Sequence, residues 1–581
     1  MKKIKYLSII FCSTLLAFVQ QSCTDLEPKL YSQIDQTDYE SDPELAFDGK
    51  FGDVYVNLQR EYGYVYREGF WSLQENTTDE CIVPTRWAGD WYDSGNFWKL
   101  HNHMFTSTLR EIAANGKSGY NAWNFCYTGI TKCNSMIQWM DKVNANRPRE
   151  RAELVIFRCF YHYLLLDNFG NIPYVSKTSD TYTPVQCTRA QAFDSIMTDM
   201  LANLQTVRED KVYARINKSV GWMIMAKMYL NAEAWGVVGH AHYAPTAAQC
   251  YAKAALYCDS IIDKGLYSLE PDYKTNFLVK NEGSTENMWN VVYDAALSKG
   301  MQFHMMTLHY KSKETFNLKN TPWNGYCTTH KFIGIYDSND IRLNETWLRG
   351  QQYSKAGSLL TAEIAVDSVT YKLMPSYIRK PVGYPALNPG KNPVTLSFPV
   401  YFTDTITTLT NVDVASGSKN KILNVFQGAR FRKFEYEENV GDHMSNDFPI
   451  FRYADVLLMK GEALMRANGG VATTEALDAI NQVRTRANAT AYDASLTLDE
   501  LLMERGRELC WEGFRRQDLI RFGRFTGVKS LSDEGDPYNL WILKNINDGS
   551  GAPLEATPDY KKIFPLPDFA VDGGYTQNPG Y

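Results

Sequence analysis

The stretch TTDECIVPTRWAGDWYDSGNFW, residues 77–98, concentrates side chains that can bind a ligand. It carries Trp87, Trp91 and Trp98 in a segment whose glycines, serine and proline predict mostly loop. Flat aromatic rings stack on apolar faces, while charged and amide groups add directional hydrogen bonds. A sugar needs both, because it presents C–H faces and rims of hydroxyl groups. The polar candidates in this stretch are Asp79, Arg86, Asp90 and Asn96.

The spacing of the tryptophans leaves two interpretations open. Trp87 and Trp91 stand at i and i+4, so both can lie on one side of a short helical turn, and Trp98 follows the predicted turn at 93–95. Two or three stacking platforms at about 1–3 kcal/mol each would give millimolar to micromolar affinity, which suits a protein that releases its cargo. The alternative is that the indoles pin a long loop onto the rest of the fold.

Motifs for covalent or metal-dependent catalysis are absent from the sequence. There is no GxSxG, HExxH, P-loop or GxGxxG pattern. The pairs His101-x-His103 and His240-x-His242 lack an evident third ligand, which favours solvated loop histidines over a metal site. We expect no cofactor, no metal and no enzymatic activity. A glycosidase needs only two carboxylates, however, so an α-helical glycoside hydrolase remains an alternative, as does a helical-repeat scaffold that binds only proteins.

Arginines and acids interleave near the C-terminus. The members are Arg505, Arg507, Arg515, Arg516, Arg521 and Arg524 with Glu504, Glu508, Glu512 and Asp518. This alternation is typical of an ion-paired helix surface and not of a phosphate site. The formal net charge of −6 and the lack of an unpaired basic cluster argue against a nucleic-acid partner.

A helical scaffold is predicted around these segments. Apolar residues recur at helical spacing in 123–137, 154–165, 193–204, 222–230, 254–262, 453–467, 477–487 and 501–510. Thr188 with Gln191, and Thr497 with Glu500, form capping boxes, whereas Gly265 and Gly513 are placed to end helices. Taken as neighbours, these helices make about four antiparallel pairs, as in a tetratricopeptide-type solenoid. A plain helical bundle is the alternative.

The helical rhythm stops between Leu269 and Asp447. This region is rich in Gly, Asn, Ser, Thr and Pro, with extended runs such as VTYKLM (369–374) and TDTITTLTNV (403–412). The predicted fold is therefore mainly α, with a long, loop-rich and partly β insertion.

The N-terminus has the order of a secretory leader. Lysines at 2, 3 and 5 precede an apolar run from Tyr6 to Val19 that is too short to span a bilayer. Ser22–Cys23 resembles a lipoprotein cleavage box, which predicts a signal peptide over 1–22 and lipidation of Cys23. Eleven cysteines without tight spacing favour buried thiols over a disulfide framework.

Several segments together resemble the SusD/RagB family of surface glycan-binding lipoproteins. They are ELVIFRCFYHYLLLDNFGNIPYV (153–175), ARINKSVGWMIMAKMYLNAEAW (214–235), YAKAALYCDSIIDKGLYSL (251–269), DFPIFRYADVLLMKGEALMRA (447–467), ERGRELCWEGFRRQDLIRFGRF (504–525) and IFPLPDFAVDGGYTQNPGY (563–581). They follow the family's order from end to end, whereas 350–445 matches nothing recognisable.

The resemblance implies a lipid-anchored protein of the outer membrane that covers a SusC-like TonB-dependent transporter and delivers oligosaccharide, or another nutrient such as a peptide, to it. It also implies two regions, 23–270 with helical pairs and the aromatic loop and 271–581 with the insertion, whose loops carry the ligand site. TPWNGYC (321–327), before IYDSNDIR (335–342), corresponds to the second part of the family's aromatic site and nominates Trp323 and Tyr326. Tyr293 is a further candidate, while Asp337 and Asp340 are expected to cap a helix and pair with Arg342.

Overall fold

The computed structural model describes most of the chain after residue 42. Outside the description lie residues 1–42, 60–62, 85, 87–90, 92–95, 114–120, 178–182, 241, 367–393, 407–422, 527–535, 539 and 542–556, together with the side chains of 43–45, 98, 423 and 424. The predicted leader, Cys23 and VTYKLM therefore fall outside the described residues. The chain divides into two compact units, Met1–Asp53 and Val54–Tyr581, and the second holds every element after the first described helix.

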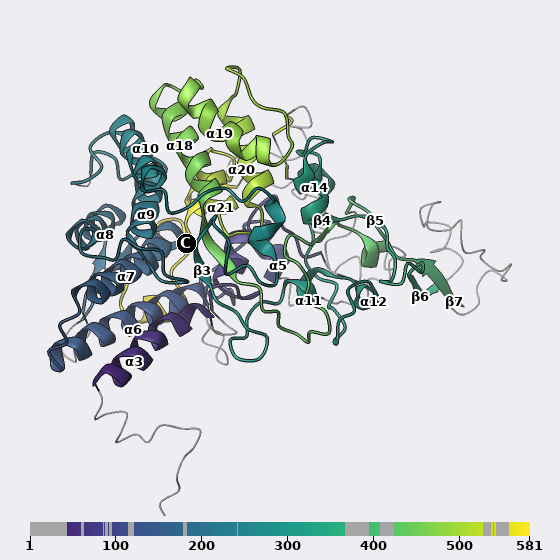
Figure 1. Cartoon of the computed structure of the whole chain (residues 1–581), viewed down its shortest axis with the longest axis horizontal. Coiled ribbons are helices and arrows are strands. Elements are labelled where there is room, and N and C mark those ends of the chain that lie inside the picture. Colours follow the sequence, from purple (N-terminus) through teal and green to yellow (C-terminus); the bar gives the residue numbers. More distant parts are fainter. Residues whose placement is uncertain are drawn as a thin grey trace, which may run out of the picture. The chain divides into compact units, whose positions relative to one another are not determined.

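Helices make up most of the regular structure (Figure 1). The long ones are α3 (Pro43–Gln59), α6 (Ala122–Lys142), α7 (Pro148–Phe169), α8 (Arg189–Leu204), α9 (Lys218–Asn231), α10 (Ala247–Lys264), α18 (Tyr453–Ala467), α19 (Thr474–Arg486) and α20 (Leu498–Leu509). Shorter helical segments are α4 (Phe70–Glu75), α5 (Asn96–His101), η3 (Tyr273–Phe277), α11 (Phe303–Thr307), α12 (Ser312–Phe316), α13 (His330–Ile333), α14 (Ile341–Thr346), η4 (Leu423–Phe426), α21 (Arg515–Arg521), η6 (Asp559–Lys562) and α22 (Asp568–Asp572).

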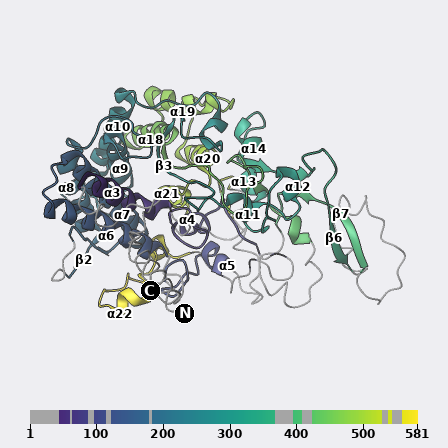
Figure 2. The same cartoon turned by 60° about the horizontal axis from the view of Figure 1, so that its bottom comes forward.

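The long helices of the second unit pack pairwise in chain order. Helix α6 contacts α7, α7 contacts α8, α9 contacts α10, and α18 contacts α19 and α20. The α6–α7 approach is close at Gly129, where an added Cβ would lie 2.2 Å from Cζ of Tyr161. Helix α10 also packs on α18, although the whole insertion separates them in the sequence (Figures 1 and 2). The predicted helical pairs are thus joined into one stack across the insertion.

The ends of these helices test the predicted caps. Thr188 and Gln191 form the complete capping box of α8, and Gly265 ends α10 in the left-handed region at φ 66°. Thr497 caps α20, but Glu500 does not close the box, because its Oε1 accepts from Arg507. The prediction that Gly513 ends this helix was wrong. Helix α20 ends at Leu509, because Cys510 already has extended backbone.

The strands are short and pair only in twos among the described residues. They are β1 (Ile172–Pro173), β2 (Gln186–Cys187), β3 (Asn287–Val291), β4 (Trp347–Leu348), β5 (Gly350–Gln351), β6 (Thr361–Val366), β7 (Val394–Pro399), β8 (Tyr401–Phe402), β9 (Arg430–Phe431) and β10 (Phe448–Arg452). Antiparallel pairs join β1 with β2, β3 with β10, β4 with β9, β5 with β8 and β6 with β7. In both views the β6–β7 hairpin lies at the end of the second unit away from α7–α10.

The insertion has a small apolar core of its own. Its buried members are Leu360, Ala362, Val366, Phe398, Val400, Phe402, Val425 and Phe426. The residues come from β6, β7, β8 and η4, so this cluster holds the hairpin on its base. The predicted mainly helical fold with a loop-rich, partly β insertion is confirmed.

The described cysteines are thiols, as predicted. All nine are free, and eight of them are buried, while Cys187 is half-buried. Among the helices that the structure describes, none combines the length and the apolar character needed to cross a membrane.

Candidate ligand-binding site

A hollow of about 640 Å³ lies where the aromatic stretch meets the insertion. Four segments that are distant in the sequence line it, which are Arg67 and Glu68, Trp91 and Phe97, Tyr310, and Thr321, Pro322 and Trp323. Its volume is in the range of small-molecule sites. The mixture of aromatic rings with an arginine and a glutamate is the one expected for a ligand with apolar faces and polar edges.

Trp91 and Trp323 are tied to each other. The Trp91 Nε1–H donates a 2.7 Å hydrogen bond to the Trp323 carbonyl oxygen, and the two ring centroids are 6.3 Å apart at an interplanar angle of 46°. Both side chains are half-buried, so each indole keeps part of its surface in solvent. Trp91 has a φ of 61°, so the backbone turns there and does not continue the helical turn predicted for Trp87 and Trp91.

Gly325 makes room for the Trp91 ring. A Cβ at this position would lie 2.3 Å from Cε2 of the indole, far inside van der Waals contact. The glycine is held by its own backbone, because its N–H donates to the Met306 carbonyl in α11 at 2.9 Å. The Trp323 N–H likewise donates to the Met305 carbonyl at 2.7 Å. Helix α11 therefore fixes the loop that fixes both indoles.

The aromatic stretch and the 321–327 loop are joined directly. Ile82 and Cys327 form an antiparallel bridge with two backbone hydrogen bonds of 2.9 Å each. Phe97 in α5 and Tyr326 pack beneath Trp91, with ring centroids at 5.8 Å and 5.4 Å from it. The lower side of the Trp91 ring is thus buried against a rigid aromatic layer.

Charged groups flank the indoles. The Arg67 guanidinium lies over the Trp323 ring at 5.1 Å, and 28% of its side chain is exposed. Its Nε donates to Glu68 Oε1 at 3.3 Å, while Arg110 Nη1 lies 3.5 Å from the same oxygen. A half-exposed arginine and glutamate can exchange water for a ligand at modest cost, because neither is fully desolvated.

Asp79 and Arg86 are buried and engaged elsewhere. Asp79 accepts from Arg515 Nε at 2.8 Å and from its Nη2 at 2.9 Å. Arg86 is fully buried and donates to the carbonyls of Gln427 at 2.7 Å and Gly325 at 2.9 Å. Neither side chain lines the hollow, so their direct roles are to hold the aromatic stretch on α21 and on the insertion.

Tyr326 and Tyr293 also lie in the interior. Tyr326 is fully buried, and its hydroxyl donates to the Arg67 carbonyl at 2.7 Å, so it supports the hollow from below. Tyr293 is 3% exposed and packs against Gly300, away from the residues that line the hollow. Trp323 is the candidate from the insertion whose ring reaches the surface of the hollow.

The remaining candidates are only partly described. Asn96 begins α5 and is half-buried, but it does not line the hollow. Trp98 lies in α5 with its side chain outside the description, and Trp87 and Asp90 lie outside it entirely. They remain predictions.

Arg67, Glu68 and Tyr310 line the hollow without having been singled out from the sequence. No motif or spacing marks them, because each reaches the hollow from a loop or turn whose path depends on distant contacts. The one available signal was the aromatic run Tyr62, Tyr64 and Tyr66 immediately before Arg67.

Comparison with known proteins supplies the family. Residues 264–581 match the SusD family over more than half of the 581-residue chain, and residues 35–230 match a family described as starch-binding and associating with the outer membrane. The chain belongs to the SusD family. This membership confirms the resemblance seen in the sequence and indicates a protein of the outer membrane, as predicted.

Individual SusD-family relatives cover the whole chain. The starch-binding protein SusD of Bacteroides thetaiotaomicron is 24% identical, with all of both chains aligned. A SusD-like protein P38 of Formosa agariphila is 27% identical over 23% of this chain and 28% of its own.

Solved structures agree in fold. Surface glycan-binding protein A of Bacteroides thetaiotaomicron, in complex with laminarihexaose, has a TM-score of 0.61 at 20% identity, covering 92% of this chain and 99% of its own. A SusD homologue of the same organism has a TM-score of 0.64 at 19% identity, covering 94% and 100%.

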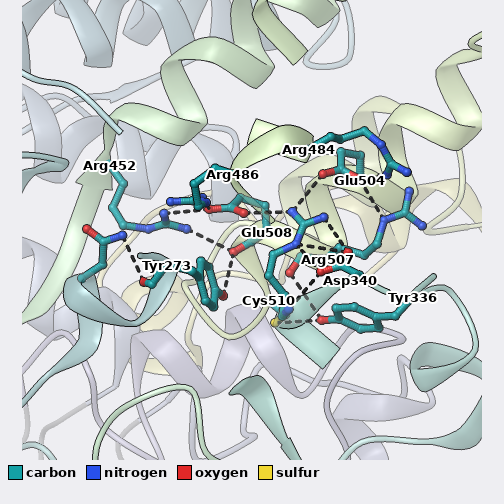
Figure 3. A network of polar contacts seen from close by, with 12 residues as sticks. Tyr273, Tyr336, Asp340, Arg452, Arg484, Arg486, Glu504, Arg507, Glu508 and Cys510 are labelled. Carbon is teal, nitrogen blue, oxygen red and sulfur yellow. Dashed lines mark hydrogen bonds and ion pairs between the residues drawn. The ribbon is translucent and has the colours of Figure 1, made fainter. Parts of the chain in front are cut away.

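The arginine-rich segment of this SusD-family chain forms a buried network and not a surface (Figure 3). Arg452 donates to Glu512 Oε2 at 2.8 Å and to Glu508 Oε1 at 2.9 Å, and Arg342 donates to Glu508 Oε2 at 2.9 Å. Pairing was predicted correctly. The surface position was wrong, because η3, α14, β10 and α19 cover this side of α20 and remove it from water.

The capping prediction for Asp337 and Asp340 was half right. Asp340 caps α14 and pairs with Arg342 at 2.7 Å, whereas Asp337 pairs with Arg484 at 2.7 Å.

The two histidine pairs behave differently. His240 and His242 are exposed, as expected of loop histidines, but His101 and His103 are buried against Trp541 and Phe525, so that part of the prediction was wrong. Within the described residues no group of three or more candidate ligands could hold a metal ion.

Proposed function

We propose that this protein binds an oligosaccharide in the hollow formed around Trp91 and Trp323. The observation that carries the proposal is the position of two half-exposed indoles, 6.3 Å apart, beside the guanidinium of Arg67 and the carboxylate of Glu68. The rings offer stacking faces for C–H surfaces, and the charged pair offers a donor and an acceptor for hydroxyl groups. The names of relatives, which include starch and laminarihexaose as ligands, support a glucan as the first class to test.

Binding without chemical conversion fits this hollow better than hydrolysis. A glycosidase requires two carboxyl groups about 5–9.5 Å apart across the scissile bond. Among the lining residues Glu68 is the single carboxylate, and Arg67, Arg110 and the Tyr66 hydroxyl already contact it. We therefore propose a binding protein that releases its ligand unchanged.

Delivery is the second part of the proposal. A lipid group on Cys23 would anchor the protein to the outer membrane, where it passes the oligosaccharide to a SusC-like TonB-dependent transporter. Family membership and the leader-like N-terminus support this role. Co-purification of a large outer-membrane barrel with the tagged, full-length protein is the expected result, and recovery of the protein alone under mild detergent would contradict delivery.

The binding proposal is tested with a glycan array on the chain without residues 1–22, followed by calorimetry with malto- and laminari-oligosaccharides. Trp91→Ala and Trp323→Ala should each weaken binding by about fivefold to 150-fold, since one stacking platform is worth about 1–3 kcal/mol. The matched control is Trp222→Ala, which removes a half-buried indole from α9, far from the lining residues. Equal binding by all three variants would contradict the site.

Chromatography of the oligosaccharides after prolonged incubation separates binding from hydrolysis. Unchanged chain lengths are expected, and shortened products would establish an enzyme instead.

A further inference from the structure

A second hollow of about 540 Å³ adjoins the first one at Tyr310, which lines both. Its other walls are His309 and Lys311 on one side and the β6 strand with Val425 on the other. Tyr310 is half-buried, so its ring forms a shared boundary that is open on both sides.

The second hollow runs along the edge of β6. Residues Thr361 through Ala365 line it without interruption, although side chains of a strand alternate between its two faces. Consecutive residues can line one hollow only where it follows the strand edge. The opposite edge is occupied, because β7 pairs with β6 in register from Thr361↔Pro399 to Val366↔Val394.

The edge that faces the hollow carries no strand within the part of the chain that the structure describes. An unpaired edge presents a row of backbone N–H donors and carbonyl acceptors. Beside this row lie the apolar Ile364 and Val425 and the exposed carboxylate of Glu363. The second hollow thus combines apolar surface with hydrogen-bonding groups, as the first does.

We propose that the oligosaccharide site continues past Tyr310 into this second hollow, so that a longer chain binds along the β6 edge. The inference rests on the proposed function and extends it to ligand length. The occupant is the remainder of the same oligosaccharide, because the two hollows meet at one side chain and share the same chemistry. In this arrangement the insertion selects for long oligosaccharides, whereas Trp91 and Trp323 bind any ligand of the right sugar type.

The test is a length series of malto- and laminari-oligosaccharides, from disaccharide to decasaccharide, titrated calorimetrically against the chain without residues 1–22. Affinity should rise about tenfold between the short and the long members, equivalent to about 1.4 kcal/mol. Ala365→Trp, at an exposed position of β6, should fill the second hollow and abolish this gain while leaving the affinity for short oligosaccharides unchanged.

The matched control is Thr395→Trp. Thr395 is the cross-strand partner of Ala365, is also exposed, and does not line the hollow. Tryptophan is favourable in strands, so both variants should keep the hairpin, which circular dichroism and thermal unfolding check. Glu363→Ala is a second, smaller change that should remove part of the gain without adding bulk.

The outcomes separate the two proposals. Tight binding of short sugars with no gain in length, or the same gain in Ala365→Trp as in Thr395→Trp, overturns the extended site and leaves the first hollow intact. A hollow that accepts a polypeptide strand instead of a sugar gives that same result. Absence of binding to both series by the unaltered protein overturns the proposed glucan function and this inference with it.

Discussion

The hollow and the buried arginine network place the same side-chain types in opposite surroundings. In the hollow, Arg67 keeps 28% of its side chain exposed, lies 5.1 Å over Trp323 and shares Glu68 with Arg110. In the network, Arg452 is fully buried and bonded to Glu286, Glu508 and Glu512. A buried charge without its partner is very costly, so the network has no freedom to accept a ligand. The hollow retains that freedom because water still reaches its charges.

The pKa values express this difference. Burial by itself raises the pKa of Glu504, but the guanidinium groups of Arg342, Arg507 and Arg484 outweigh it and hold that pKa at about 2. Such a carboxylate stays ionised throughout the range in which the protein functions. Its contribution to stability is present above its unfolded pKa of about 4.5 and is lost as pH falls toward about 2.

The largest expected effect comes from breaking the network. Glu508→Gln removes a charge that Arg452, Arg342 and Arg486 share, so the free energy of unfolding should fall by about 3–5 kcal/mol. Urea denaturation followed by circular dichroism measures it. The control is Asp141→Asn, which removes an exposed pair with Arg151 and should leave the midpoint unchanged. Similar midpoints for both variants would show that burial of the network has been overestimated.

A smaller effect is expected at the floor of the hollow. Gly325→Ala forces a Cβ against the Trp91 indole and should cost about 1–3 kcal/mol of stability by overpacking. Displacement of the ring should also weaken oligosaccharide binding. Gly283→Ala, where an added Cβ meets no atom within 4 Å, is the control. Unaltered binding and stability in Gly325→Ala would mean that the Trp91 position is not as constrained as its contacts indicate.

A pH effect sharpens the comparison with acids that lack matched partners. Burial raises the pKa of Glu75 to about 7, against the lowering effect of its hydrogen bonds with Glu80 and the Gly513 N–H. Because the folded value is raised, the stabilising contribution is complete below the unfolded pKa of 4.5 and is lost as pH rises through about 7.

Glu75→Gln is neutral at every pH and should flatten this dependence, which is at most about 1.4 kcal/mol per pH unit. Urea midpoints of both proteins between pH 5 and pH 8 provide the measurement. Parallel curves for the unaltered protein and the variant would contradict the raised pKa.

The smallest effect is expected for the arginine of the hollow. Arg67→Gln should lower the free energy of unfolding by only about 0.5–1 kcal/mol, the usual value of an exposed cation–π contact. Arg452→Gln is the buried counterpart and should cost several times more. Equal losses in the two variants would remove the distinction between the two regions.

Local patterns in the sequence predicted the helices well. The apolar spacing located α6 to α10 and α18 to α20, and the Thr188 capping box formed as expected, since both depend on residues a few positions apart. The end of α20 was misplaced, because Gly513 is left-handed for a different reason: its N–H donates to Glu75 Oε1 across the core.

The site was predictable in type and only in part by residue. Trp91 and Trp323 line the hollow, whereas Asp79, Arg86 and Tyr326 support it from inside, and Arg67, Glu68 and Tyr310 gave no signal in the sequence.

By itself the sequence determined where the helices lie, that the middle of the chain is irregular, that arginines pair with acids, and that an aromatic-rich loop precedes the first long helical pair. Those properties follow from side chains that are near each other along the chain. Only the tertiary structure decided which rings face solvent, which ion pairs are buried, and that β6 borders the same Tyr310 as the indoles. Burial depends on contacts between residues hundreds of positions apart, and no local spacing encodes them.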